Sequence, residues 1–170
     1  MKSLIATICI LGMICIVTGL TVRAADTGTV SCTVTAKSIA LTVSDGDVAY
    51  GTVAESGSQD TTSTGVDDTQ TVTNTGNIAE QINIKTSGAS GGAPWTVGIT
   101  AGSDVFVHSF ATTTDETWQI LDTVNEYETA SSSVAVSGTL DIDLKINVPT
   151  SSTDNEEKTI TVTIQAVEAS

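Results

Sequence analysis

Hydrophobic and polar residues alternate with a period of two along much of this 170-residue chain. The clearest run covers 140–148, where every second position is apolar: Leu140, Ile142, Leu144, Ile146 and Val148. After a polar linker, a second run over 160–166 repeats the pattern with Ile160, Val162, Ile164 and Ala166. Successive side chains of a strand point to opposite faces, so each run predicts a strand with one buried face. The linker at 149–155 predicts that these two strands pair as an antiparallel hairpin.

Shorter runs predict further strands at 30–34, 39–43, 70–75, 78–86, 95–100, 104–110, 118–121 and 133–136. The apolar positions change phase between Val34 and Ile39, which requires a bulge or bend near residues 36–37. No segment carries a helical pattern of apolar residues, and 123–130 is expected to form one turn of helix at most. Many short strands without helices predict a single antiparallel β-sandwich, immunoglobulin-like or jelly-roll, over residues 25–170.

Three connections have distinctive composition. Residues 74–77, Asn-Thr-Gly-Asn, predict a turn. The segment Ser56–Asp68 is polar and low in complexity, so we expect a mobile surface loop there. The segment Ser87–Pro94 is rich in glycine and predicts a second loop.

The first 24 residues have the organisation of a secretory signal. Lys2 precedes an apolar run from Leu4 to Leu20, and alanines follow at positions 24 and 25. This order predicts cleavage after Ala24, or alternatively after Ala25. One alternative is an uncleaved membrane anchor, but Arg23 would then have to cross the membrane, which disfavours it. The other is the helical stalk of a pilin-like subunit, but no Gly/Ala-Glu junction precedes the apolar run. We therefore expect a secreted, cell-surface protein that meets the membrane only if this segment is left uncleaved.

Acidic residues dominate the charge of the chain. It has 20 acidic and six basic residues, a formal charge of −14. Cleavage after Ala24 removes two of the basic residues, Lys2 and Arg23, and none of the acidic ones, so the mature charge becomes −16. Such a field repels nucleic acid and anionic membranes, which excludes both as expected partners.

The residues that could carry catalysis are few. Cys32 is the only cysteine after the signal, and its position between Val30 and Val34 predicts a buried, inert thiol. His108, between Phe106 and Phe110 on one strand face, is expected to be a packing residue. No Gly-X-Ser-X-Gly turn, phosphate-binding loop or dinucleotide fingerprint is present in the sequence. We therefore expect no enzymatic activity.

Paired acids are the one signal for a cofactor. Asp45-Gly46-Asp47 leads a set of acidic pairs in or near expected loops: 67–68, 115–116 and 156–157. Carboxylates on loops are typical ligands of Ca²⁺, so Asp45 and Asp47 are candidates for a structural calcium site. Asp-Gly is also ordinary turn chemistry, and none of the pairs has the spacing of a dedicated calcium loop.

One stretch resembles a known family. Residues 68–77, Asp-Thr-Gln-Thr-Val-Thr-Asn-Thr-Gly-Asn, are followed by Ile-Ala-Glu-Gln-Ile-Asn-Ile at 78–84. Over residues 66–86 this is similar to the strand–turn–strand unit of secreted immunoglobulin-like sandwich proteins of bacterial and archaeal surfaces. Camelysin-like proteins and the related biofilm-fibre subunits carry such a unit. The resemblance implies a sandwich fold and a structural, polymer-forming role without catalysis.

The segment next to the signal offers a physical route to assembly. Residues 25–35 could complete the sheet of a neighbouring copy, with Val30, Cys32 and Val34 filling its pockets. The alternative is that this segment is the first strand of its own sandwich. We therefore expect a non-covalently assembled subunit of a surface layer, matrix or filament. A secreted binding or adhesion module, with ligand contacts on loops 56–68 and 87–94, is the other function considered.

Overall fold

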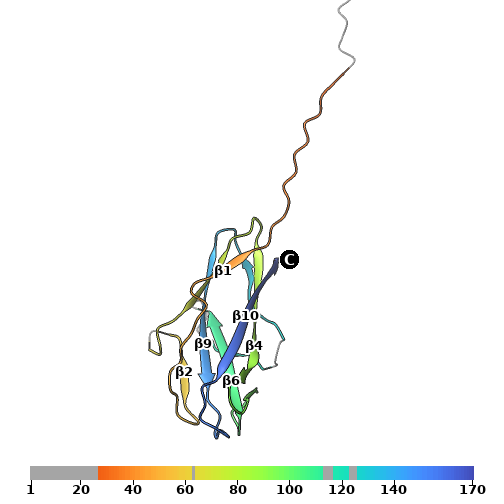
Figure 1. Cartoon of the computed structure of the whole chain (residues 1–170). Coiled ribbons are helices and arrows are strands. Elements are labelled where there is room, and N and C mark those ends of the chain that lie inside the picture. Colours follow the sequence, from red (N-terminus) through yellow and green to blue (C-terminus); the bar gives the residue numbers. More distant parts are fainter. Residues whose placement is uncertain (1–26, 63, 113–116, 123–125) are drawn as a thin grey trace, which may run out of the picture. The chain divides into compact units, whose positions relative to one another are not determined.

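A computed structural model describes residues 27–62, 64–112, 117–122 and 126–170 (Figure 1). The expected signal segment, 1–24, lies outside the described residues. The chain divides into two units, residues 1–35 and residues 36–170. The described part of the first unit, 27–35, contains no strand. All strands belong to the second unit. Across the described ranges, no helix is long and apolar enough to cross a membrane.

The described residues of the second unit form ten strands. In chain order they are β1 (Leu41–Val43), β2 (Ser58–Asp60), β3 (Gln70–Asn74), β4 (Glu80–Ser90), β5 (Thr96–Val97), β6 (Val105–Thr112), β7 (Gln119–Ile120), β8 (Glu128–Val134), β9 (Thr139–Asn147) and β10 (Thr159–Glu168). The described residues contain no helix, so the predicted all-β class is confirmed.

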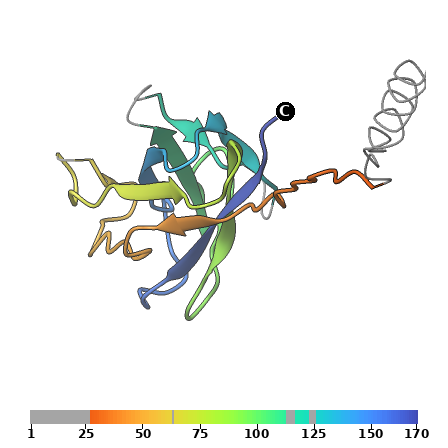
Figure 2. The same cartoon turned by 90° about the horizontal axis from the view of Figure 1, so that it is seen from above.

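The strands form two sheets that face each other as a β-sandwich (Figures 1 and 2). The larger sheet has the order β1-β3-β9-β6-β5, with β2 also paired to β9 and β7 to β6. The smaller sheet has only three strands, in the order β10-β4-β8. Its pairings are antiparallel, as are those of the larger sheet apart from the parallel pair β5–β6. The two layers therefore differ in width, seven strands against three.

The core lies between the sheets and is contributed by both. Val72, Phe110 and Ile142 of the large sheet pack in one cluster with Ile82 and Ile84 of the small sheet, and all five are essentially inaccessible. Each of these residues occupies an alternate position in its strand, as the sequence pattern requires. Burial of apolar side chains from two layers is what holds such a sandwich together.

The predicted hairpin of residues 140–166 is wrong in its pairing, although both strands exist. β9 lies in the large sheet between β3 and β6, whereas β10 lies in the small sheet beside β4. The two apolar faces meet across the core instead of lying side by side. Alternation specifies which face is buried, and it does so equally for strands in one sheet and for strands in opposite sheets.

Several local predictions need correction. The expected mobile loop 56–68 contains β2, which pairs with β9, and a fully buried Thr61. The expected loop 87–94 begins later, because β4 continues to Ser90. The predicted helical turn at 123–130 overlaps β8, which begins at Glu128, while 123–125 lie outside the described residues. Part of the polarity of 56–68 and 87–94 belongs to threonines and serines whose hydroxyls donate hydrogen bonds: Thr61, Thr62 and Ser87.

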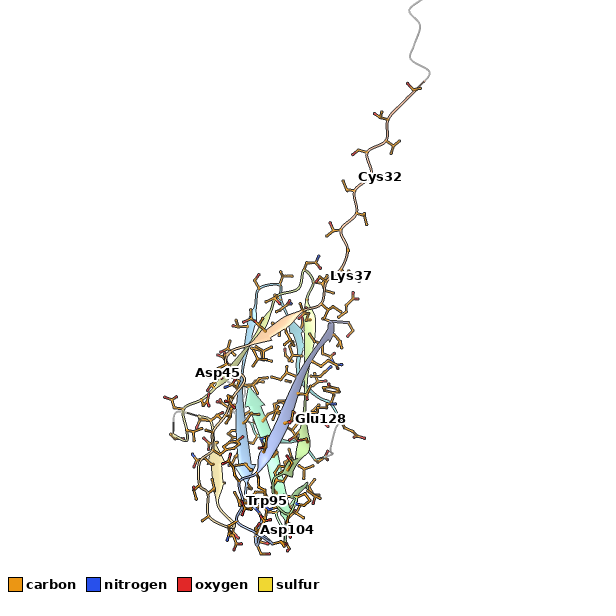
Figure 3. The ribbon with its side chains drawn as sticks, viewed as in Figure 1. Cys32, Lys37, Asp45, Trp95, Asp104 and Glu128 are labelled. Atoms are coloured by element: carbon orange, nitrogen blue, oxygen red, sulfur yellow. The ribbon has the colours of Figure 1, made fainter. Side chains whose placement is uncertain are left out.

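The stretch 30–34 is not a strand, and Cys32 is not buried. Residues 27–35 have no assigned secondary structure, and the Cys32 side chain is exposed (Figure 3). Val30 and Val34 are exposed as well, by 86% and 96%. An alternating pattern makes a strand only where a neighbouring strand supplies its hydrogen bonds, and this segment has none within the described chain.

Candidate functional site

The small sheet ends in a long edge strand. β10 pairs with β4 on one side, and among the described residues nothing pairs with its other edge. Its register places Ile164 opposite Ile84 and Ala166 opposite Ile82, so these residues face the core. Ile82 and Ile84 are completely buried, but Val162, Ile164 and Ala166 remain partly exposed. A strand edge of this length presents a row of unpaired N–H and C=O groups.

A cleft of about 800 Å³ opens between the two sheets beside this edge. One wall is apolar and comes from the large sheet: Leu144 and Ile146 of β9, and Val148 just after it. The opposite wall is Ile160 and Val162 of β10. A smaller cavity of about 140 Å³ shares Leu144 and Val162 with the cleft and continues past Ile164. The groove therefore follows the inner face of β10 over about half its length.

The third wall is a segment that we call the strap, Gly46–Val53, which connects β1 towards β2. Val48 and Tyr50 pack against the core clusters, and Tyr50 touches both of them. Between Val48 and Val53, no backbone group has a hydrogen bond to any described residue. Side chains rather than a ladder hold the strap in place.

Glycines stand at two points of the strap where the backbone is left-handed. Gly46 has φ +73° and Gly51 has φ +70°, and a Cβ at either position would meet no other atom within 4 Å. The backbone conformation, not crowding, is therefore what requires glycine. The strap is anchored at its first residue, because the Gly46 N–H donates to Gln70 Oε1 at 3.0 Å.

A buried histidine lies at the inner end of the cleft. His108 is 1% exposed, and its Nε2 is 3.1 Å from the Tyr50 hydroxyl while Nδ1 is 2.8 Å from Thr86 Oγ1. Burial without a countercharge lowers the pKa of His108 to about 4, so the ring is neutral at physiological pH. Burial also raises the pKa of Tyr50, with smaller contributions from Asp60 and Asp68. The predicted packing role of His108 is confirmed, with two hydrogen bonds that the sequence did not indicate.

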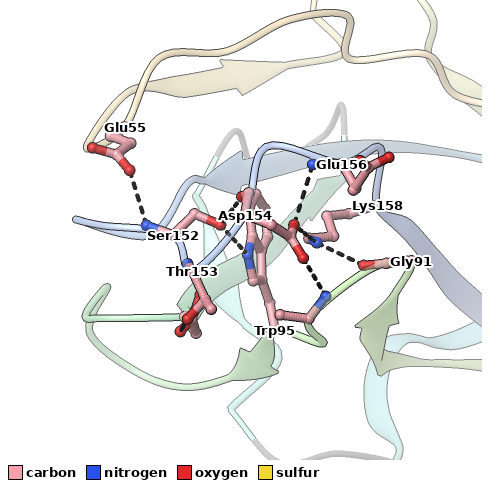
Figure 4. Close-up of polar contacts among 10 residues, drawn as sticks. Glu55, Gly91, Trp95, Ser152, Thr153, Asp154, Glu156 and Lys158 are labelled. Atoms are coloured by element: carbon pink, nitrogen blue, oxygen red, sulfur yellow. Dashed lines mark hydrogen bonds and ion pairs between the residues drawn. The ribbon is translucent and has the colours of Figure 1, made fainter.

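Acidic residues and one lysine surround the outer end of the cleft. Lys158, with a side chain 4% exposed, donates to Asp154 Oδ1 at 2.5 Å and to the Gly91 carbonyl at 2.6 Å (Figure 4). Hydrogen bonds to its carboxylate lower the pKa of Asp154; the bond from the Ala93 N–H has the largest effect and the bond from Lys158 the next largest. Trp95 lies beneath Lys158, with 5.5 Å between the ammonium and the ring centre, and its Nε1 donates to Ser152. These contacts fix the connection between β9 and β10 across the end of the sandwich.

The expected calcium ligands lie beside the strap. Asp45 Oδ1 accepts the Gln70 amide at 3.0 Å and the Asp47 N–H at 3.3 Å (Figure 3). These two hydrogen bonds lower the pKa of Asp45, and the one from the Gln70 amide has the larger effect. In the described ranges no three acidic, histidine or cysteine side chains gather into a metal-binding group. The calcium site therefore stays a prediction based on two residues.

The Asn-Thr-Gly-Asn turn has a specific task. Asn77 accepts the Ser38 N–H and donates to the Ala36 carbonyl, both at 2.8 Å, and Glu80 accepts the Ala40 N–H at 2.8 Å. The turn thus fixes residues 36–40, where the chain enters the sandwich. It also carries the chain from β3 in one sheet to β4 in the other.

The segment before this anchor is the second half of the candidate site. We call residues 27–35 the arm: all nine are exposed, none is charged, and Val30, Cys32 and Val34 occupy alternate positions. The sequence identified the arm residues but not the cleft, the strap or Tyr50. The apolar content of the strap is only Val48, Tyr50 and Val53 among small residues, too little for a pattern.

Three comparisons with known proteins were without a match. No protein-family model matches the chain, and no curated protein or solved structure matches it either.

Proposed function

We propose that this protein is an extracellular structural subunit that polymerises without covalent links, and that residues 25–35 of one copy insert beside β10 of the next. The observation that supports this most directly is a matched pair within one chain. An uncharged arm exposes alternate apolar residues, and an edge strand borders an apolar cleft. The family resemblance of residues 66–86 points in the same direction.

The pattern of the arm fits the two faces of β10. In an added strand, Val30, Cys32 and Val34 would point into the cleft towards Val162 and its neighbours. Ser31 and Thr33 would then continue the polar outer face, where β10 carries Thr161 and Thr163. The nine arm residues also match the ten residues of β10 in length.

The energetics require both side chains and backbone. Burying two valines contributes about 3–6 kcal/mol. Association costs about 4–15 kcal/mol in lost freedom, so the side chains alone do not suffice. Ladder hydrogen bonds add about 1 kcal/mol each along the arm. Release of water from the apolar part of the cleft wall favours insertion further.

Charge explains why residues 27–35 of the inserted segment should be neutral; its one acidic residue, Asp26, lies at its start. Asp47, Glu55, Asp154, Glu156 and Glu157 line the cleft, so an acidic arm would be repelled. Whole subunits of charge −16 also repel each other, and added salt screens this repulsion. We therefore expect polymerisation to become faster as ionic strength rises from about 10 to 150 mM, where the screening length falls from roughly 30 to 8 Å.

The test is negative-stain electron microscopy of the chain from Ala25 onward, with and without millimolar Ca²⁺. Filaments or sheets are expected, and their dependence on calcium would show whether the acidic residues bridge neighbouring copies. Dispersed particles under both conditions, at every salt concentration, would contradict the proposal and favour the binding module.

Two matched double variants test the role of the arm. Val30→Asp with Val34→Asp places two charges on the face that enters the cleft, and should abolish polymers. Ser31→Asp with Thr33→Asp adds the same charge to the same segment on the outward face. It should slow polymer growth at low salt, because the cleft lining is acidic, but polymers should still form at 150 mM salt, where the screening length is about 8 Å. Polymers from both variants would mean that the arm is not inserted.

A further inference from the structure

We propose that the strap is a second docking edge, so that an inserted arm is hydrogen-bonded on both sides, to β10 on one and to the strap on the other. This inference rests on the proposed assembly and specifies how the cleft holds its occupant. The partner is the same in both cases, the arm of a second copy of this chain.

The first argument is the unpaired backbone of the strap. Val48–Val53 has six residues whose N–H and C=O groups find no partner among the described residues, although Val48, Tyr50 and Val53 are partly buried. Nearly all backbone groups in folded proteins are paired, and those facing an open cleft depend on water. Free backbone groups beside a cleft are what an added strand pairs with, and the strap offers them on both sides of the left-handed Gly51.

The second argument is position. The strap and β10 both line the same cleft, and β10 has its own free edge there. Paired strands lie about 4.8 Å apart, so a strand between two partners requires those partners to be roughly 9.6 Å apart. The arm would then bridge the small sheet and the strap, and close the side of the sandwich that is open in the single subunit.

The third argument is that the strap is able to adjust. Its backbone is held by hydrogen bonds before Val48, at Gly46, and beyond Val53, where the Ser56 N–H donates to the Pro149 carbonyl at 2.9 Å. Gly46 and Gly51 have no atom within 4 Å of the position a Cβ would take, and glycine gives the backbone wide freedom at both points. Tyr50 keeps the strap attached to the core through His108 while the backbone on either side shifts.

Hydrogen–deuterium exchange of the chain from Ala25, dispersed and assembled, tests this inference. In dispersed subunits we expect the amides of 48–53 to exchange rapidly. After assembly, β10 should gain protection, and about three of the six strap amides should exchange at least ten-fold more slowly, because alternate residues of a strand face the same neighbour.

The possible results are distinct. Protection of β10 without protection of the strap would overturn the second edge while leaving the proposed function intact. Strap amides that are already protected in dispersed subunits would overturn it as well. Absence of assembly and of protection at both places would refute the inference together with the function on which it rests.

A pair of proline variants gives an independent readout. Ala49 and Thr52 are both exposed and lie on the two sides of the left-handed Gly51, and proline at either position removes one N–H of the strap. At least one of Ala49→Pro and Thr52→Pro should therefore slow polymer growth at least ten-fold relative to the unsubstituted chain. Thermal denaturation of the dispersed subunits checks that each variant is still folded. Unchanged growth for both variants would overturn the second edge.

Discussion

Acidification is expected to weaken this sandwich through one group in particular, His108. The ring is 1% exposed, has no carboxylate among its hydrogen-bond partners, and its pKa in the folded protein is about 4. In the unfolded chain the pKa is about 6.5. Above pH 6.5 both states are neutral, and the histidine does not influence stability. Below pH 6.5 the unfolded state binds a proton at His108 and the folded state does not, so the free energy of unfolding decreases as the pH falls.

The size of the effect follows from the two pKa values. Between pH 7 and pH 5.5 the loss is about 1 kcal/mol, and between pH 7 and pH 4.5 it is about 2 kcal/mol. Below pH 4 the folded state also binds the proton, and the loss levels off at about 3 kcal/mol. Such a loss is a substantial part of the ~5–15 kcal/mol that stabilises a typical domain.

The assay is urea denaturation of the protein and of His108→Gln at pH 7, 5.5 and 4.5. The variant keeps a polar side chain but cannot take up a proton, and the acidic residues contribute equally to both proteins. The difference in unfolding free energy between the two should therefore shrink by about 2 kcal/mol as the pH falls to 4.5. Parallel pH curves for the two proteins would refute the reasoning, because they would mean that the folded ring titrates normally.

Three further substitutions test the core and its polar contacts, each by urea or thermal denaturation. Ile84→Ala removes a fully buried side chain between the sheets and should cost about 2–5 kcal/mol. Thr61→Val leaves the Leu144 N–H without its acceptor and should cost about 1–3 kcal/mol, whereas no loss would show that water replaces the hydroxyl. Asn74→Ala removes donors to the Ile78 and Val134 carbonyls and should cost about as much; an unchanged midpoint would contradict that estimate.

The sequence specified the faces of the strands better than their partners. Alternation identified β9 and β10 and the side chains they bury, because period two depends only on which side of a strand is dry. It did not show that β9 enters the large sheet and β10 the small one. The connection between them is held by Lys158, which pairs with Asp154 and lies over Trp95, about 60 residues earlier in the sequence. Long-range contacts of this kind leave no periodic signal.

The arm shows the opposite error. Val30, Cys32 and Val34 have the same alternation as the true strands, so the sequence favoured a buried thiol on a strand of this sandwich. The structure leaves all three exposed. Composition alone cannot decide whether an alternating segment finds its partner within the chain. The strap is a different case. Tyr50 attaches it to the core, but the strap has no alternation of apolar residues that could have identified it in the sequence. Its proposed role depends on unpaired backbone groups, which the sequence does not reveal.

The unequal width of the two sheets and the exposed arm can be explained by the same proposed assembly. With seven described strands on one side and three on the other, Val162, Ile164 and Ala166 of β10 stay partly exposed, and the cleft lies beside this strand. A subunit that worked alone would be expected to fill this space with its own chain or to narrow its large sheet. This chain instead places nine uncharged, alternating residues directly before the turn-anchored segment 36–40. If that arm served another purpose, both its neutrality in a chain of charge −14 and its spacing of apolar residues would need separate explanations. The proposed insertion beside β10 of a second copy would account for both.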